Sequence, residues 1–213
     1  MSFEIWLAFV AASTALLLIP GPTVLLVLSY ALSQGRRVAV STAAGVAVGD
    51  LVAMTASLAG LGALVLTSAT LFTVLKWVGA VYLIWLGVRL IRTAGRGGPG
   101  GLGDLPATAE ITAGKTFSHA AAVTALNPKS IAFFIAFVPQ FVDPERPLIP
   151  QFAILIGSFV GLATLNALAY ALLADQLRAR LRRPGVIAWL TRAGGAMLIG
   201  MGVLTATLRR AQG

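Results

Sequence analysis

One acidic residue, Asp50, lies deep inside a long apolar segment and is the best placed side chain for chemistry. It ends the sequence Gly-Val-Ala-Val-Gly-Asp at 45–50. A carboxylate surrounded by hydrocarbon is costly unless it is paired, protonated or hydrated. Asp50 is therefore suited to proton coupling or to binding a substrate amine. The alternative is a structural pairing with Lys76 or Lys129, or a position nearer the membrane interface.

Pro20, Gly21 and Pro22 fall in the middle of the first apolar segment. Each proline removes a backbone donor and clashes with the preceding helical turn, so two of them around a glycine predict a broken helix. Non-helical backbone at membrane depth is tolerated only inside protein or beside a water-filled cavity. Carbonyls and helix ends freed there can bind a polar ligand. The alternative is a simple kink.

Asn127, Pro128 and Lys129 combine a helix break with an amide and a cation. Alternatively the helix begins here, with Asn127 as N-cap and Pro128 at the first helical position. Lys129 would then extend to the membrane interface. A start at 127 leaves about 14 residues before Asp143, which is short for a membrane span. Both interpretations stay open.

Two further polar residues and two glycine pairs have weaker signals. Gln140 and Asn166 either line a cavity or form hydrogen bonds across helices. Gly45-xxx-Gly49 and Gly157-xxx-Gly161 remove side-chain bulk from one helix face and predict close helix packing. That packing could lie within one chain or between two copies, so a homodimer is possible. His119 is expected at the cytoplasmic interface.

The composition excludes several other functions. The chain has no Cys and one His, so disulfides, thiol catalysis and a His-rich metal centre are excluded, and we expect no metal and no cofactor. An enzyme would need a paired acid and base or an activated nucleophile, and one deep carboxylate supplies neither. The net charge is +9, but the arginines lie between apolar segments without interleaved aromatic residues. Nucleic acid is therefore not an expected partner.

The composition of the chain that carries these residues is typical of a protein surrounded by lipid. Of 213 residues 58% are hydrophobic and 11% are charged, against about 25% charged in soluble domains. We expect an all-α membrane protein with a single domain over 1–213 and about six transmembrane helices. The expected spans are 4–32, 39–66, 71–92, 118–141, 149–175 and 187–208.

Lys and Arg predict the orientation of the chain. Ten of them lie in one set of loops and three on the other side. Cytoplasmic loops carry the excess of positive charge, so the first set is placed in the cytoplasm. With six spans both termini then lie outside, and the Gly-rich linker at 93–116 is cytoplasmic.

The chain also repeats itself. The segment 79–88 matches the segment 194–203 at five of ten positions, 115 residues apart. The breaks at 20–22 and 127–128 recur in the same order. Three helices per half give the halves, about 4–92 and 117–210, opposite orientations, which is a transporter architecture. The alternative is a chance likeness between apolar, Gly-rich helices.

Together these motifs resemble the LysE/RhtB family of amino-acid exporters over nearly the whole chain. The motifs are Leu-Ile-Pro-Gly-Pro at 18–22, Gly-Val-Ala-Val-Gly-Asp at 45–50, Lys-Trp-Val-Gly-Ala-Val-Tyr-Leu-Ile-Trp-Leu-Gly at 76–87, Asn-Pro-Lys at 127–129, Pro-Gln-Phe at 139–141 and Gly-Gly at 194–195. The resemblance implies efflux of amino acids or their derivatives across the bacterial inner membrane, driven by the proton gradient. It carries over to Pro20, Gly21, Pro22, Gly49, Asp50, Asn127, Pro128 and Lys129.

Our hypothesis is a proton-coupled exporter whose two broken segments meet and form the substrate site. Helix ends and backbone amides would hold the carboxylate of the cargo, since anions prefer helix N-termini. Asp50 would take the proton or the amine. The rival hypotheses are a membrane-embedded enzyme, a non-transporting membrane scaffold and an exporter of another small solute or cation. The sequence does not reveal the cargo.

Overall fold

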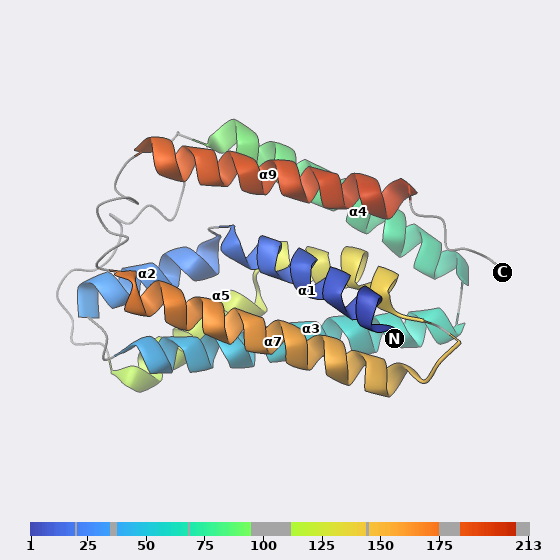
Figure 1. The fold of residues 1–213 in the computed structure, drawn as a ribbon, viewed down its shortest axis with the longest axis horizontal. Helices are drawn as coiled ribbons and strands as arrows, with labels where there is room; N and C mark the ends of the chain where they lie inside the picture. The colour runs from blue at the N-terminus through green and yellow to red at the C-terminus, as the bar shows by residue number, and fades with distance from the viewer. Residues whose placement is uncertain are drawn as a thin grey trace.

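The described part of the protein is a bundle of helices lying roughly along one axis (Figure 1). The structure, a computed structural model, describes residues 1–19, 21–34, 38–67, 69–94, 112–143, 145–174 and 184–207. Within those residues the chain forms helices and no strand, as the sequence predicts. Helices α4 (Ala69–Thr93) and α9 (Pro184–Thr207) pair along one side of the bundle.

The first apolar segment is broken where the prolines predict. Helix α1 (Phe3–Leu18) is capped by Ile19, and helix α2 (Pro22–Gln34) begins at Pro22 after a bend of 55°. Proline at the first position of a helix loses no hydrogen bond, because that amide has no helical partner. Pro20 lies outside the described residues.

The segment around Asn127 satisfies both interpretations of its sequence. Helix α5 (Ala113–Ala125) ends, and a new helix α6 (Pro128–Ala132) begins with Asn127 as its N-cap. Helix α6 continues into a π-helix, η2 (Phe133–Phe137), and a 3-10 helix, η3 (Val138–Phe141). Because α5 precedes the break, the helical segment from 113 to 141 is 29 residues long and is not too short to span a membrane.

Among the described residues, three helical segments are long and apolar enough to cross a membrane, and the bent pair of α1 and α2, counted as one span, makes up to four. The three are Ala39–Gly60 in helix α3 (Ala39–Thr67), Ala113–Phe141, and helix α7 (Leu148–Leu172). Helices α4 and α9 cover the remaining two predicted spans with 25 and 24 residues. The arrangement of six spans in two inverted repeats stays a prediction.

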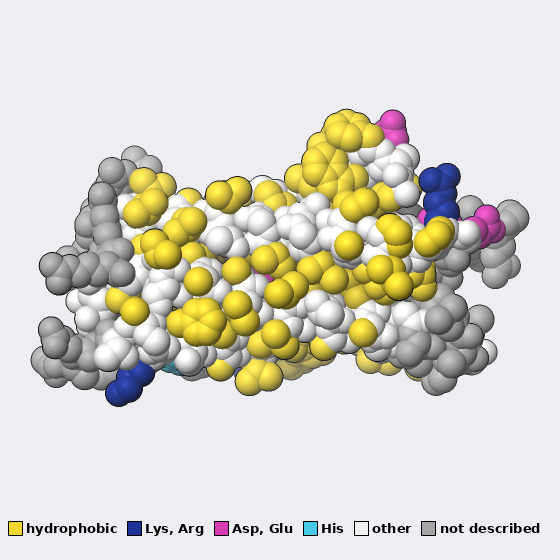
Figure 2. Space-filling model, turned by 90° about the horizontal axis from the view of Figure 1, so that it is seen from below, with side chains coloured by type: hydrophobic (Ala, Val, Ile, Leu, Met, Phe, Trp, Pro, Cys, Tyr) yellow, Lys and Arg dark blue, Asp and Glu magenta, His cyan; other side chains and the backbone are white. Residues whose placement is uncertain are grey.

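The surface fits a lipid environment. In the face that Figure 2 shows, hydrophobic side chains spread over the length of the molecule, and the Lys and Arg side chains drawn in colour lie near its two ends. Leu165 and Trp189 expose 66% and 67% of their surface. Such large exposed apolar side chains, one on α7 and one on α9, indicate a surface covered by hydrocarbon.

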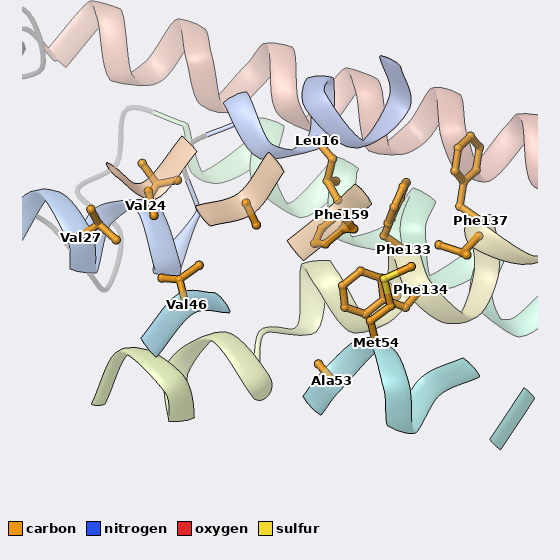
Figure 3. Close-up of a cluster of buried hydrophobic side chains, with 14 of the residues drawn as sticks. Leu16, Val24, Val27, Val46, Ala53, Met54, Phe133, Phe134, Phe137 and Phe159 are labelled. Atoms are coloured by element: carbon orange, nitrogen blue, oxygen red, sulfur yellow. The ribbon is translucent and has the colours of Figure 1, made fainter. Parts of the chain in front are cut away.

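Inside the bundle, phenylalanine rings form much of the core. Phe133, Phe134 and Phe159 are fully buried, and the ring centroids of Phe134 and Phe159 are 4.8 Å apart. Figure 3 shows Phe133 and Phe134 on one side of Leu16, with Val24, Val27 and Val46 on the opposite side. This packing fixes α6 and η2 against α1 and α7.

Glycines determine how closely two helix pairs approach. A Cβ atom at Gly49 would lie 2.6 Å from the carbonyl oxygen of Ala121, and one at Gly45 would collide with the carbonyl oxygen of Phe117, so α3 and α5 touch backbone to backbone. Gly87 and Gly195 play the same part between α4 and α9.

The other predicted packing pair behaves differently. Gly157 and Gly161 on α7 have no atom within 4 Å of the place where a Cβ would stand. The prediction of close packing is therefore confirmed within this chain for Gly45-xxx-Gly49, whereas Gly157-xxx-Gly161 has no such neighbour among the described residues, and packing of that pair against a second copy stays a prediction. The two pairs have the same spacing, but only the α3 pair faces another helix.

The same substitution at these two kinds of glycine should have different effects. We expect Gly49→Ala to lower the free energy of unfolding by about 1–3 kcal/mol, because the added methyl group meets backbone that cannot yield. Gly200→Ala, on α9 where no described atom lies within 4 Å of the added methyl group, is the matched control and should not lower it, because alanine is the better helix former. Denaturation in mixed micelles measures both, and equal effects would contradict this account of the α3–α5 contact.

Candidate functional site

A small internal cavity lies where the two helix breaks meet. Its volume is about 30 Å³, roughly the space of one water molecule. Gly21 and several apolar residues of α1, α2, α3 and α7 line it. Its polar lining residues are Thr23, Asp50, Asn127, Lys129, Ser130, Asn166 and Tyr170. The structure therefore brings together most of the residues that the sequence singled out.

Lys129 reaches from α6 to the broken end of α1. Its Nζ atom donates hydrogen bonds to the carbonyl oxygens of Leu16 and Ile19, both at 3.1 Å, and the residue is 8% exposed. A cation is stabilised at a helix C-terminus, where the carbonyls carry negative partial charge. A Cβ atom at Gly21 would lie 3.3 Å from Nζ, so glycine leaves room for the ammonium group. The alternative that Lys129 extends to the membrane interface is wrong.

Two side chains of α7 donate hydrogen bonds to the two carbonyls of α1 that lie between Leu16 and Ile19. Asn166 donates from Nδ2 to the carbonyl oxygen of Leu17, and the Tyr170 hydroxyl donates to the carbonyl oxygen of Leu18, both at 3.2 Å. A helix end leaves four carbonyls without helical partners. Together with Lys129, these residues give each carbonyl from 16 to 19 a side-chain donor.

Asn127 joins the two breaks directly. Its Oδ1 atom accepts a hydrogen bond from the backbone amide of Lys129 at 3.1 Å, which caps α6. Its Nδ2 atom donates to the hydroxyl oxygen of Thr23 in the first turn of α2, also at 3.1 Å. The side-chain amide of Asn127 thus caps the start of α6 and links it by a hydrogen bond to the start of α2, at the other helix break.

Asp50 faces the same cavity without a partner. It is 2% exposed, and its Oδ1 atom has no hydrogen bond among the described residues. Asp50 and Lys129 interact electrostatically across the cavity, but the contact ion pair among the described residues joins Asp143 and Arg146, so the proposed pairing is not a direct salt bridge. The side chain of Lys76, the other proposed partner, is not among the described ones. Asp50 lies midway along Ala39–Gly60, away from the ends of that span.

The remaining predicted residues lie elsewhere. Pro22 and Pro128 begin helices and do not line the cavity. Gln140 is also absent from it and donates to the Thr205 hydroxyl at 2.7 Å, so it bonds across helices. His119 is exposed on α5, and its Nδ1 atom is hydrogen-bonded to the Tyr30 hydroxyl at 2.7 Å.

Thr23, Ser130 and Tyr170 line the cavity although the sequence interpretation did not select them. Thr23 and Ser130 each stand next to a predicted break, so adjacency alone could have found them. Tyr170 lies four residues after Asn166 and so shares a face of α7 with it. That spacing was available in the sequence, but nothing there shows that the face meets α1.

Comparison with known proteins decides the family. The model of the LysE type translocator family matches residues 5–209. The chain belongs to this family. The LysE resemblance seen in the sequence is thereby confirmed, and the protein is a membrane transporter and not an enzyme. No solved structure matches the chain.

Three relatives of this LysE type translocator illustrate the range of the family. The chain is 35% identical over 212 residues to the homoserine/homoserine lactone efflux protein of Salmonella typhimurium, covering 99% of this chain and 100% of the relative. It is 33% identical to an uncharacterized membrane protein of Vibrio cholerae, covering 98% and 100%. It is 33% identical to the leucine efflux protein of Klebsiella pneumoniae over 140 residues, covering 65% and 63%.

The bond between Asn127 and Thr23 should appear as an energetic coupling. We expect Asn127→Ala to lower the free energy of unfolding by about 1–2 kcal/mol, since it removes an N-cap. Thr23→Val should cost about 1 kcal/mol. The double variant should be more stable than the sum predicts by about 1 kcal/mol, because both single changes remove the same bond. Thr164→Val, which loses a hydrogen bond within α7, is the control. The effects of Thr164→Val and Thr23→Val should simply add. Additive effects of Asn127→Ala and Thr23→Val would contradict the coupling.

Proposed function

We propose that this protein is a proton-coupled secondary exporter of amino acids or their small derivatives across the bacterial inner membrane. The observation that carries the proposal is the carboxyl group of Asp50, buried without a partner in a cavity between two helix breaks. A carboxyl group in such a place needs a proton, water or a cation. A proton and the ammonium group of an amino acid are the two that an exporter of this kind exchanges.

Asp50 couples these two by holding one at a time. When it is protonated it has no charge to bind an ammonium group, and when an ammonium group is bound there is no site for the proton. Cargo released outside is therefore replaced by a proton, which is carried inward as the site returns. This mutual exclusion gives antiport without a second ion site.

The relatives support an amine-bearing cargo. Homoserine, homoserine lactone and leucine, named in the relatives, each carry one amine. The carboxylate or other polar end of the cargo would lie near the start of α2, where Gly21 and Thr23 line the cavity and where the helix dipole favours negative charge. The backbone amide of Lys129 at the start of α6 is already used by Asn127, which makes that helix end less suited.

Transport requires the cavity to enlarge. A volume of about 30 Å³ holds water and not an amino acid. We therefore place the structure in the proposed cycle as an occluded conformation, in which both sides are closed. The site would lie between two inverted three-helix repeats, 4–92 and 117–210, and movement of the helices that line it would open it to each side in turn.

The remaining parts of the proposal concern topology and assembly. We propose six spans, with the basic loops and the linker at 93–116 in the cytoplasm. A homodimer stays a prediction, and the uncovered face of α7 with Gly157 and Gly161 is where we place its contact, since small residues allow helices to approach.

Replacing Asp50 should stop coupled transport. We expect Asp50→Asn to insert and fold, because the amide fills the same space, and to lower efflux driven by a proton gradient by at least about a hundredfold. Uptake into inverted vesicles, whose lumen corresponds to the outside of the cell, measures this export with and without the proton gradient. Glu4→Gln, an exposed acid at the start of α1, is the matched control and should behave as wild type. Gradient-driven efflux at the wild-type rate by Asp50→Asn would overturn the role of Asp50.

The topology can be tested with single cysteines, because the natural chain has none. We expect Glu145→Cys to react with a membrane-impermeant maleimide in intact cells. Lys115→Cys should react only after the cells are permeabilised, since the segment Ala113–Phe141 lies between the two positions. Labelling of both positions from the same side would contradict a membrane span there.

A further inference from the structure

The two charged side chains that line the cavity differ in the hydrogen bonds that they form. In the described part of the chain, Asp50 and Lys129 are the two charged residues that line it. Lys129 already donates to Leu16 and Ile19, whereas the Oδ1 atom of Asp50 has no partner. Asp50 and the Lys129 ammonium interact electrostatically without a direct salt bridge, so the carboxylate still has an open position for a cation. The carbonyls of α1, the other cation acceptors, are already occupied by Lys129.

The neutral polar groups do not supply another position for a cation. The Asn127 side-chain oxygen accepts from the backbone of Lys129, and Asn166 and Tyr170 donate to α1 carbonyls. Their free hydrogen-bonding capacity is small and carries no negative charge. A cargo with a second ammonium group would have to place that group near the ammonium of Lys129, where like charges repel in a low dielectric.

We propose that Lys129 determines specificity: its ammonium group occupies the carbonyl end of α1 and so excludes dibasic cargo, which leaves a site for molecules with one amine. The inference rests on the proposed function in that the cargo is an amine bound at Asp50. It goes beyond that function because it assigns the discrimination between monoamines and diamines to one residue.

Removal of the Lys129 side chain should leave a binding site for the second ammonium group that it excludes. Without Nζ, the carbonyls of Leu16 and Ile19 face the cavity at the negative end of the α1 dipole. The lining residues would then carry one negative charge in place of zero. Gly21 leaves space against this end, so the terminal ammonium of a dibasic amino acid could take the position of Nζ. The substitution should therefore create a preference for dibasic amino acids, and not merely remove the preference for cargo with one amine.

Lysine and norleucine are matched probes, because they share a carbon chain and differ in the terminal ammonium group. Calorimetric titration of the purified full-length protein with each gives the ratio of their affinities. For wild type we expect norleucine to bind at least about tenfold more tightly than lysine, given the penalty for juxtaposed like charges. For Lys129→Met the ratio should shift by at least about tenfold toward lysine.

Three further variants separate charge from structure. Lys129→Gln, which keeps a donor for the α1 carbonyls, should also shift the ratio toward lysine, because it removes the charge. Lys129→Arg keeps the charge and should retain the wild-type preference. Lys115→Met removes an exposed lysine of α5 and should leave the ratio unchanged. Gel filtration and thermal unfolding identify the variants that are folded.

The outcomes that overturn the proposal are specific. It fails if wild type binds lysine as tightly as norleucine, or binds neither, whatever the variants do. It also fails if folded Lys129→Met or Lys129→Gln keeps the wild-type ratio. Efflux of the same two probes from vesicles is measured in parallel. Wild type that binds norleucine selectively but transports nothing would refute the proposed exporter while leaving the role of Lys129 supported.

Discussion

The interior of this protein is organised around a helix that ends where water is scarce. Each helix C-terminus leaves carbonyl oxygens without helical partners, and an unsatisfied carbonyl in hydrocarbon costs several kcal/mol. The break at 20–22 creates such an end, and donors from α6 and α7 satisfy it. Those helices must therefore pack against α1, and the placement of α1 in turn brings Gly21 and Thr23 beside Asn127. The cavity follows from these contacts.

The same requirement explains why the site can open. The contacts across it are single hydrogen bonds from neutral groups and one ammonium, and each has a modest net energy, about 0.5–1.5 kcal/mol for neutral pairs. An ammonium or hydroxyl group of a cargo can replace such a donor with little loss. By contrast, the buried phenylalanines beside the cavity are held by extensive ring contacts. Rigid aromatic packing thus adjoins an exchangeable polar interface.

The sequence predicted the features that depend on local chemistry. Paired prolines and the Asn-Pro pair determined where helices end, and a lone acid in an apolar run had to be buried without water, so Asp50 and both breaks could be located. The partners could not be predicted. Nothing in the spacing of Lys129 shows that its ammonium binds α1 carbonyls, and Tyr170 looks like any aromatic residue of a membrane helix. Gly45 and Gly157 begin identical motifs, yet packing depends on which face meets a neighbour, and that is a property of the assembled bundle.

The glycine contacts determine which helices must move together. Backbone contact at Gly45 and Gly49 fastens α3 to α5, and Gly87 and Gly195 fasten α4 to α9 in the same manner. Each fastened pair takes one helix from the first part of the chain and one from the second. Asp50 consequently travels with α5 rather than with α1 and α2, its neighbours in sequence. The seam along which the bundle can part therefore need not follow the boundary between the first and second parts of the chain.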